Sequence, residues 1–196
     1  MWWHLLSARC LVAVVLVLSA SSASADPAVA KDAGANFLVR LFTYACAPNI
    51  GQPEKVRTWA SDHHLSRVTS AEALQVFVGN GPDGAAWAVP SPIGSFTLSI
   101  RGKTAACAVW ARTADSGDVE LLFRRLLEGI KRPGIDVSLQ KEERTTSPGR
   151  AVRSLVYSVR PTPHEAGVLF TMLTAEKSGG PFQASLQVAP FLGLER

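Results

Sequence analysis

The sequence lacks the short motifs that mark common catalytic and phosphate-binding sites. It has no G-x-S-x-G nucleophile elbow, no H-E-x-x-H zinc helix and no G-x-x-x-x-G-K-S/T phosphate loop. Residues Ser138–Lys141 read SLQK and match the S-x-x-K pattern of serine acyl-enzymes. However, the companion S-D-N and K-T-G elements are missing and the local alternation predicts a strand. We therefore assign no catalytic residue, no metal ligand and no cofactor.

Histidine is scarce, with four in the chain. Asp62, His63 and His64 stand in a row that could suggest a metal or proton-transfer site. Consecutive helix residues point about 100° apart, so we expect one histidine to pack inward and the other to be solvated. His164 lies in a turn-rich segment beside Glu165 with no evident partner. Paired carboxylates of a glycoside hydrolase would leave no local signature, so an enzyme stays an alternative.

The chain has no hydrophobic run long enough to cross a membrane. The apolar run Leu11–Leu18 is about half of the roughly 20 residues that a spanning helix needs. It follows Arg9 and precedes small residues that end in Ala23-Ser24-Ala25, which is the order of a secretory signal peptide. We predict cleavage after Ala25, with an uncleaved anchor as the less favoured alternative. Residues 26–196 would then form one globular domain in the periplasm or outside the cell.

Only three cysteines are present, and Cys10 would leave with the signal peptide. The remaining pair, Cys46 and Cys107, is expected to form a disulfide in an oxidising compartment. In the chain-entropy model such a bond stabilises the fold by roughly 4 kcal/mol. A zinc site would need about four ligands, and a thiol nucleophile would need a base that the sequence does not place.

Charge is modest, with a formal net charge of +4. From Val119 to Arg160 there are nine Lys or Arg against five Asp or Glu. This segment could meet an anionic cell-wall or lipid component or an acidic protein, although we favour ordinary solvated faces. Export and the lack of a recognition motif argue against nucleic acid.

Hydrophobic periodicity predicts an α+β fold. Helical spacing occurs at 31–47, from Pro53, at 71–78 and at 119–130, whereas alternation predicts strands. The expected strands are 94–101, 106–112, 135–144, 151–160, 167–176 and 182–190, with 84–89 as a short edge strand. Short connections favour antiparallel pairing. We predict an antiparallel sheet of about six strands, covered by helices on one face, with N-terminal helices followed by ββαββββ.

The segment GNGPDG at 79–84 is the strongest loop signal in the chain. We expect Trp59 and Trp110 to lie in the core, whereas Trp87 directly follows this loop. Asn80, Asp83 and Trp87 are therefore the candidate residues of a surface binding loop.

Four short motifs resemble a family of small, uncharacterised envelope proteins and lipoproteins of proteobacteria. The motifs are GAAW (84–87), GSFTL (94–98), CAVWAR (107–112) and VELLFRRLL (119–127). The similarity runs from about Asn36 to about Pro190 and implies export and a single domain, with no established activity to transfer. The chain differs from the lipoprotein members because it has no cysteine at the cleavage site.

These observations favour an exported, non-catalytic protein that binds another envelope molecule. One alternative is an inhibitor or immunity protein against a secreted toxin or hydrolase, with the loop from Asn80 to Trp87 inserted in its target. A second alternative is a cell-envelope hydrolase whose site is assembled only in three dimensions.

Overall fold

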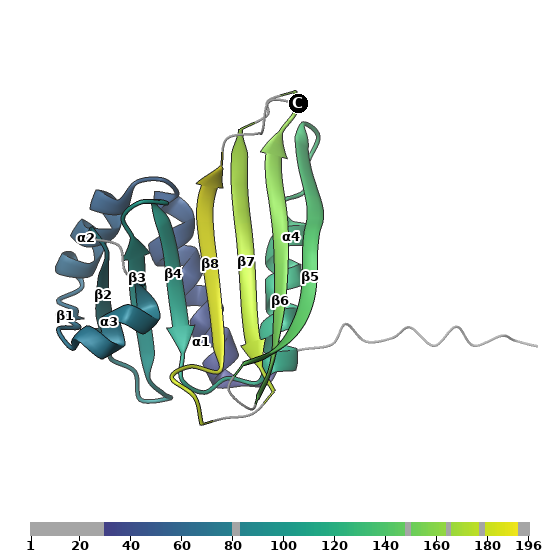
Figure 1. Ribbon diagram of the computed structural model, residues 1–196. Helices are drawn as coiled ribbons and strands as arrows, with labels where there is room; N and C mark the ends of the chain where they lie inside the picture. Colours follow the sequence, from purple (N-terminus) through teal and green to yellow (C-terminus); the bar gives the residue numbers. More distant parts are fainter. Residues whose placement is uncertain (1–29, 80–82, 148–149, 164–165, 177–178, 192–196) are drawn as a thin grey trace, which may run out of the picture.

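A computed structural model describes residues 30–79, 83–147, 150–163, 166–176 and 179–191 (Figure 1). The predicted signal peptide at 1–25, Asn80 and His164 lie outside these ranges. The helices are α1 (Ala33–Leu41), the π-helix η1 (Phe42–Cys46), the 3-10 turn η2 (Ala47–Asn49), α2 (Pro53–Asp62), α3 (Ala71–Phe77) and α4 (Ser116–Ile130). The strands are β1 (Ser66–Arg67), β2 (Ala85–Val89), β3 (Phe96–Arg101), β4 (Ala106–Ala111), β5 (Ile135–Ser147), β6 (Arg150–Pro161), β7 (Gly167–Ala175) and β8 (Ala184–Phe191).

In the described part of the chain, eight strands form one antiparallel sheet in the order β1-β2-β3-β4-β8-β7-β6-β5. Strands β1 to β4 and strands β5 to β8 are two meanders, and their last strands pair with each other from Cys107↔Val188 to Ala111↔Ala184. The predicted α+β class with an antiparallel sheet is confirmed. The sheet has eight strands rather than about six, and the order ββαββββ is not matched exactly. Strand β2 corresponds to the short edge strand expected at 84–89, whereas β1 was not predicted and α3 lies between the two.

The missed strand, β1, has only two residues, and both are exposed. It pairs with β2 through Ser66↔Ala88 and Arg67↔Trp87. Such a strand is held by backbone hydrogen bonds and buries no side chain of its own. Hydrophobic alternation therefore could not predict it.

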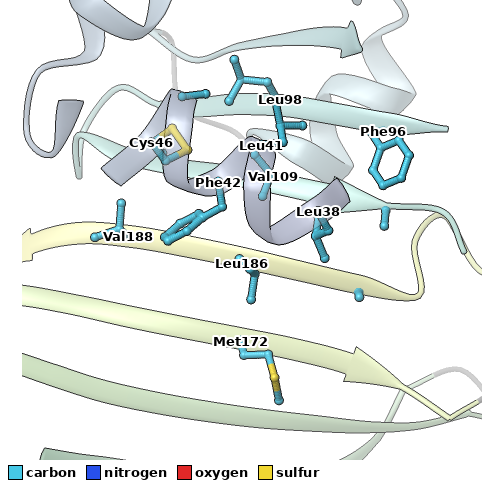
Figure 2. Packing of buried hydrophobic residues seen from close by; sticks show 14 of the residues in the cluster. Leu38, Leu41, Phe42, Cys46, Phe96, Leu98, Val109, Met172, Leu186 and Val188 are labelled. Carbon is cyan, nitrogen blue, oxygen red and sulfur yellow. A yellow bond between two sulfur atoms is a disulfide. The ribbon is translucent and has the colours of Figure 1, made fainter. Parts of the chain in front are cut away.

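Helices α1 and α4 lie side by side on one face of the sheet (Figure 1). Residues at helical spacing on α1 and η1 point onto β4 and β8, as Figure 2 shows for Leu38 and Phe42 above Leu186 and Val188. Phe123 is the largest fully buried side chain of α4. Burying a leucine or phenylalanine side chain contributes about 1.5–3 kcal/mol, so these helices supply much of the core's stability.

The sulfur atoms of Cys46 and Cys107 are 1.97 Å apart, at disulfide distance. Cys46 ends η1 and Cys107 lies in β4, so the bond ties the first helical segment to the middle of the sheet (Figure 2). Both residues are buried in the core, which places the bond out of contact with solvent.

The opposite face of the sheet is partly covered by α3 (Figure 1). Val109 belongs to the core beneath α1, and strand alternation turns the next residue, Trp110, to the other face. There the Trp110 ring contacts Phe77 at the end of α3 and Phe182, and its indole N–H donates to Ser99 Oγ at 2.8 Å. Helices therefore lie on both faces, which corrects the prediction of one covered face.

A β-bulge at Gln140 changes the direction of side chains along β5. Leu139 is opposite Tyr157 and Lys141 is opposite Val156, so Gln140 is the extra residue. After the bulge the alternation reverses, and Glu142 reaches the helix side, where it meets Arg153 with a 2.6 Å contact. Without the extra residue Glu142 would lie on the other face.

Candidate functional site

Near the end of β2 lies a groove of about 330 Å³, which we name the β2 groove. It lies between the segment that joins α2 to β1 and the turn that joins β2 to β3. Its polar side chains are His64, Ser66, Ser91 and Ser95. Its remaining lining is small or apolar and comes from Ala88, Val89, Pro90, Gly94 and Phe96. Its volume is within the range of small ligand pockets, which begins at about 300 Å³.

One wall of the β2 groove is set by the way α2 ends. The backbone N–H of His64 donates to Ser61 O at 2.9 Å, and that of Leu65 donates to Ala60 O at 2.9 Å. This is the Schellman pattern, in which glycine usually takes the left-handed position. Here His64 takes it, with φ of 52°. The reversal of the chain places the exposed His64 side chain at the rim of the groove.

The other wall is the turn Pro90–Ser95. Pro90 and Pro92 restrict φ at two of its positions, and the backbone N–H of Ile93 donates to Ser91 Oγ at 3.3 Å. Phe96 anchors the end of the turn, because its ring lies 4.5 Å from that of Phe37 and is almost fully buried. The turn is therefore stiff, and it presents Ile93 to solvent with 45% of its surface exposed.

Among the described residues, none that lines the β2 groove carries a carboxylate, an ammonium or a guanidinium group. Its chemistry is that of three hydroxyls and one imidazole, which donate and accept hydrogen bonds without a fixed charge. This differs from a hollow of about 80 Å³ beside α4, which Arg124, Glu128 and Lys131 line together with Tyr157.

No protein-family model matches the chain, and no curated protein is similar to it. The resemblance to exported envelope proteins therefore stays a prediction.

The predicted binding loop and the β2 groove are different places. Trp87 is only 7% exposed and belongs to the core, because Ala85, Trp87 and Val89 alternate toward the helices. Its side chain is therefore not a surface group. Asp83 is exposed, and its carbonyl oxygen accepts a hydrogen bond of 2.6 Å from Arg57 Nη2, which ties this end of the loop to α2.

The sequence did not point to the β2 groove, because its walls come from separate segments. The only local signal was the run PSPIGS at 90–95, which reads as a turn. Its approach to His64 and Ser66 depends on the pairing of β1 with β2, which no pattern predicted.

Both neighbouring histidines are exposed, so the expectation that one packs inward is wrong. The His63 ring stacks on Trp59 with centroids 3.9 Å apart, and its Nδ1 donates to Trp59 O at 2.8 Å. Trp59 packs against the core but is only partly buried. Among the described residues, no three His, Cys, Asp or Glu side chains are grouped so that they could hold a metal ion.

The basic segment from Val119 to Arg160 pairs largely with its own acids. Arg153 contacts Glu120 and Glu142, and Arg124 Nε donates to Glu120 at 2.9 Å. Burial alone would lower the pKa of the Arg124 guanidinium, but its hydrogen bond to Glu120 and nearby charges raise that pKa above its ordinary value. These contacts favour the solvated structural role over a surface for an anionic polymer.

Proposed function

We propose that this chain is an exported, non-catalytic protein that binds another molecule of the cell envelope in the β2 groove. The observation that carries the proposal is the groove itself. One imidazole and three serine hydroxyls line a hollow of about 330 Å³ there. Convergent polar groups in a hollow of this size are typical of binding sites.

One feature supports an extracytoplasmic location. Cys46 and Cys107 are at disulfide distance, and disulfides persist mainly in oxidising compartments. Within the described residues, no helix has the length and apolar character needed to cross a membrane.

The test is to fill the groove. Ser95→Trp puts a bulky ring into the hollow, and Thr145→Trp adds the same ring at an exposed position on β5. The chain, expressed from its full gene and recovered from the envelope, is sedimented with isolated wall and outer-surface fractions. Ser95→Trp is expected to reduce the bound fraction about tenfold, whereas Thr145→Trp leaves it unchanged. Equal binding of the two variants would exclude the β2 groove as the site.

One observation favours a second function, hydrolysis. His64 shares the groove with three serine hydroxyls, and a histidine can activate a serine nucleophile. In the described part of the chain, however, the His64 ring has no hydrogen bond to a serine hydroxyl, and no carboxylate lines the groove to orient it. A hydrolase would lose ester or amide cleavage in His64→Ala. A binding protein shows no turnover before or after that substitution.

A further inference from the structure

We infer that two copies of this chain form a symmetric dimer by pairing their β5 strands, with Val137 of each copy opposite Leu139 of the other. A second copy thus covers the free edge of β5 and joins the two sheets into one. This inference does not rest on the proposed function, because β5 and the β2 groove lie at opposite ends of the sheet (Figure 1). Both grooves remain free in such a dimer.

The free edge of β5 carries unpaired backbone groups at Val137 and Leu139. The carbonyl of Gly134 accepts from the backbone N–H of Thr162 at 2.8 Å, so Gly134 and alternate residues up to Ser138 face β6. Val137 and Leu139 therefore turn their N–H and C=O groups to the other side, where no strand of the described chain pairs with β5. Unpaired groups along a strand edge are a template for pairing with another chain.

Two features limit this free edge to a short window. On one side, the backbone N–H of Ile135 already donates to Arg132 O at 3.0 Å. On the other side, the bulge at Gln140 interrupts the alternation, and the residues directly after it are charged, which disfavours edge pairing there. The window is therefore centred on Ser138.

One antiparallel register pairs both free residues of each copy. It sets Val137 opposite Leu139 of the second copy and places Ser138 opposite its own counterpart on the twofold axis. The pairing is isologous, because each copy contributes the same surface, and it closes after two copies.

The side chains at this edge are complementary in the same register. Leu139 is 46% exposed although it is a large aliphatic residue. Beside Val137 lies the hollow of about 80 Å³, whose apolar lining comes from Leu127, Val137 and Tyr157. Directly opposite side chains on one face of a sheet lie about 5 Å apart, so Leu139 of the second copy lies next to Val137 at this hollow. Each copy thus covers the exposed leucine of the other.

Charges on α4 are complementary about the same axis. Glu120, Arg124, Glu128 and Lys131 follow one another at intervals of three or four residues along the side of α4 and its C-cap that faces β5 and β6. The twofold axis reverses the direction of α4 in the second copy, so this row of alternating sign meets its own reverse. Arg124 then faces Glu128 of the second copy, and Glu120 faces Lys131 of the second copy. Glu128 and Lys131 already pair within one copy at 2.6 Å, and the dimer extends that network.

The strand and the helix give the same position for the axis. Val137 lines the hollow together with Glu128 and Lys131, whereas Tyr157, which is opposite Leu139, accepts from Arg124 Nη1 at 2.6 Å. The midpoint between Val137 and Leu139 is therefore level with the middle of the charged row. Backbone, apolar and charged contacts thus agree on one arrangement.

The first test measures the association of the chain recovered from the envelope. Sedimentation velocity between about 1 and 100 μM is expected to show a monomer–dimer equilibrium. Leu139→Asp puts a charge into the paired edge and is expected to raise the dissociation constant about tenfold or more. Ile93→Asp, at nearly equal exposure on the turn between β2 and β3, is the matched control and changes it less than about twofold.

The second test detects the axis itself. Residues opposite each other in a non-hydrogen-bonded antiparallel pair have Cα atoms about 4.5 Å apart, a distance that a disulfide spans. Ser138→Cys is therefore expected to give a covalent dimer on a non-reducing gel. Thr145→Cys, at an exposed position on the same face of β5, is the control and should give none.

The outcomes separate this inference from the proposed function. A chain that stays monomeric up to about 100 μM overturns the dimer. If Leu139→Asp and Ile93→Asp weaken association equally, or if Ser138→Cys links no better than Thr145→Cys, the β5 edge is not the interface. Circular dichroism of Leu139→Asp checks that a loss of association is not a loss of folding. If the chain is monomeric and its envelope binding is still sensitive to Ser95→Trp, the proposed function stands without the dimer.

Discussion

Asp32 and Asp118 each accept hydrogen bonds from backbone N–H groups at the start of the other's helix. Asp118 Oδ2, in the first turn of α4, accepts from the backbone N–H groups of Lys31 and Asp32 at 2.7 and 2.6 Å. In return, Asp32 Oδ1 at the start of α1 accepts from the backbone N–H of Asp115 at 3.1 Å. The two helix amino termini approach closely at Gly34, where an added Cβ would lie 2.9 Å from Thr113 O.

Asp118→Ala removes two hydrogen bonds that join α4 to the start of α1. We expect the free energy of unfolding to fall by about 1–3 kcal/mol, because capping and charge-assisted hydrogen bonds are lost together. Urea unfolding followed by circular dichroism measures this change. Glu128→Ala, in the exposed last turn of α4, is the control and is expected to change the free energy by less than about 0.5 kcal/mol. Equal losses of unfolding free energy in the two variants would mean that the hydrogen bonds of Asp118 to the start of α1 do not stabilise the fold.

The Cys46 to Cys107 bond is tested by replacing both residues with alanine. The double variant is expected to lose about 4 kcal/mol of unfolding free energy, as loop closure predicts for a bond spanning 61 positions. Cys10→Ala is the control, because we predict that Cys10 is removed with residues 1–25. Intact mass spectrometry of the unmodified chain is expected to show an amino terminus at Asp26, no lipid, and two hydrogens fewer than the reduced form. Two free thiols would contradict both the bond and the proposed compartment.

Stability should depend on pH through Glu142. The hydrogen bond from Arg153 holds the pKa of this carboxyl below its ordinary value near 4.5. A pKa lowered by folding contributes stability that is present above the ordinary value and is lost as the pH falls through the folded value. Between about pH 6 and pH 3 the unmodified chain should therefore lose more stability than Glu142→Gln. Parallel urea titrations of the two proteins at both pH values measure the difference in unfolding free energy. If this free energy changes equally with pH in both proteins, the Glu142–Arg153 pair does not contribute to the pH dependence of stability.

His64→Gly should make the protein more stable and less able to bind. A left-handed backbone costs a residue with a Cβ roughly 1–2 kcal/mol, and glycine avoids this cost. We expect a gain of up to about 1 kcal/mol in unfolding free energy, with weaker binding to envelope fractions. His63→Gly is the matched control and should lose stability, because its φ is negative and its ring stacks on Trp59. Normal binding by the His64→Gly variant would show that the His64 imidazole takes no part in binding.

Local patterns predicted the elements whose side chains are buried at regular intervals. Val119, Phe123 and Leu127 recur at helical spacing and are buried in α4, and the alternation of Phe96, Leu98 and Ile100 corresponds to β3. In such elements the residues that are buried are the ones that recur at the period of the helix or strand. The sequence alone was therefore sufficient to predict these elements.

The remaining features of the fold and the site could not be predicted, because they depend on pairing between segments far apart in the sequence. Nothing in β8 indicates that it lies beside β4, because that pairing joins the end of one meander to the end of the other. Trp87 was assigned to a surface loop because it follows GNGPDG, but the short strand β2 turns it inward. The β2 groove depends on the pairing of β1 with β2, and its polar residues are serines and a histidine, which are ordinary on any surface.

Hydrogen–deuterium exchange on the mature chain, with and without solubilised envelope extract, tests the binding site most directly. The account predicts slower exchange at residues 64–66 and 88–96 in the presence of extract, with β5 to β8 unchanged. Protection confined to β5 to β8, or no protection anywhere, would contradict it.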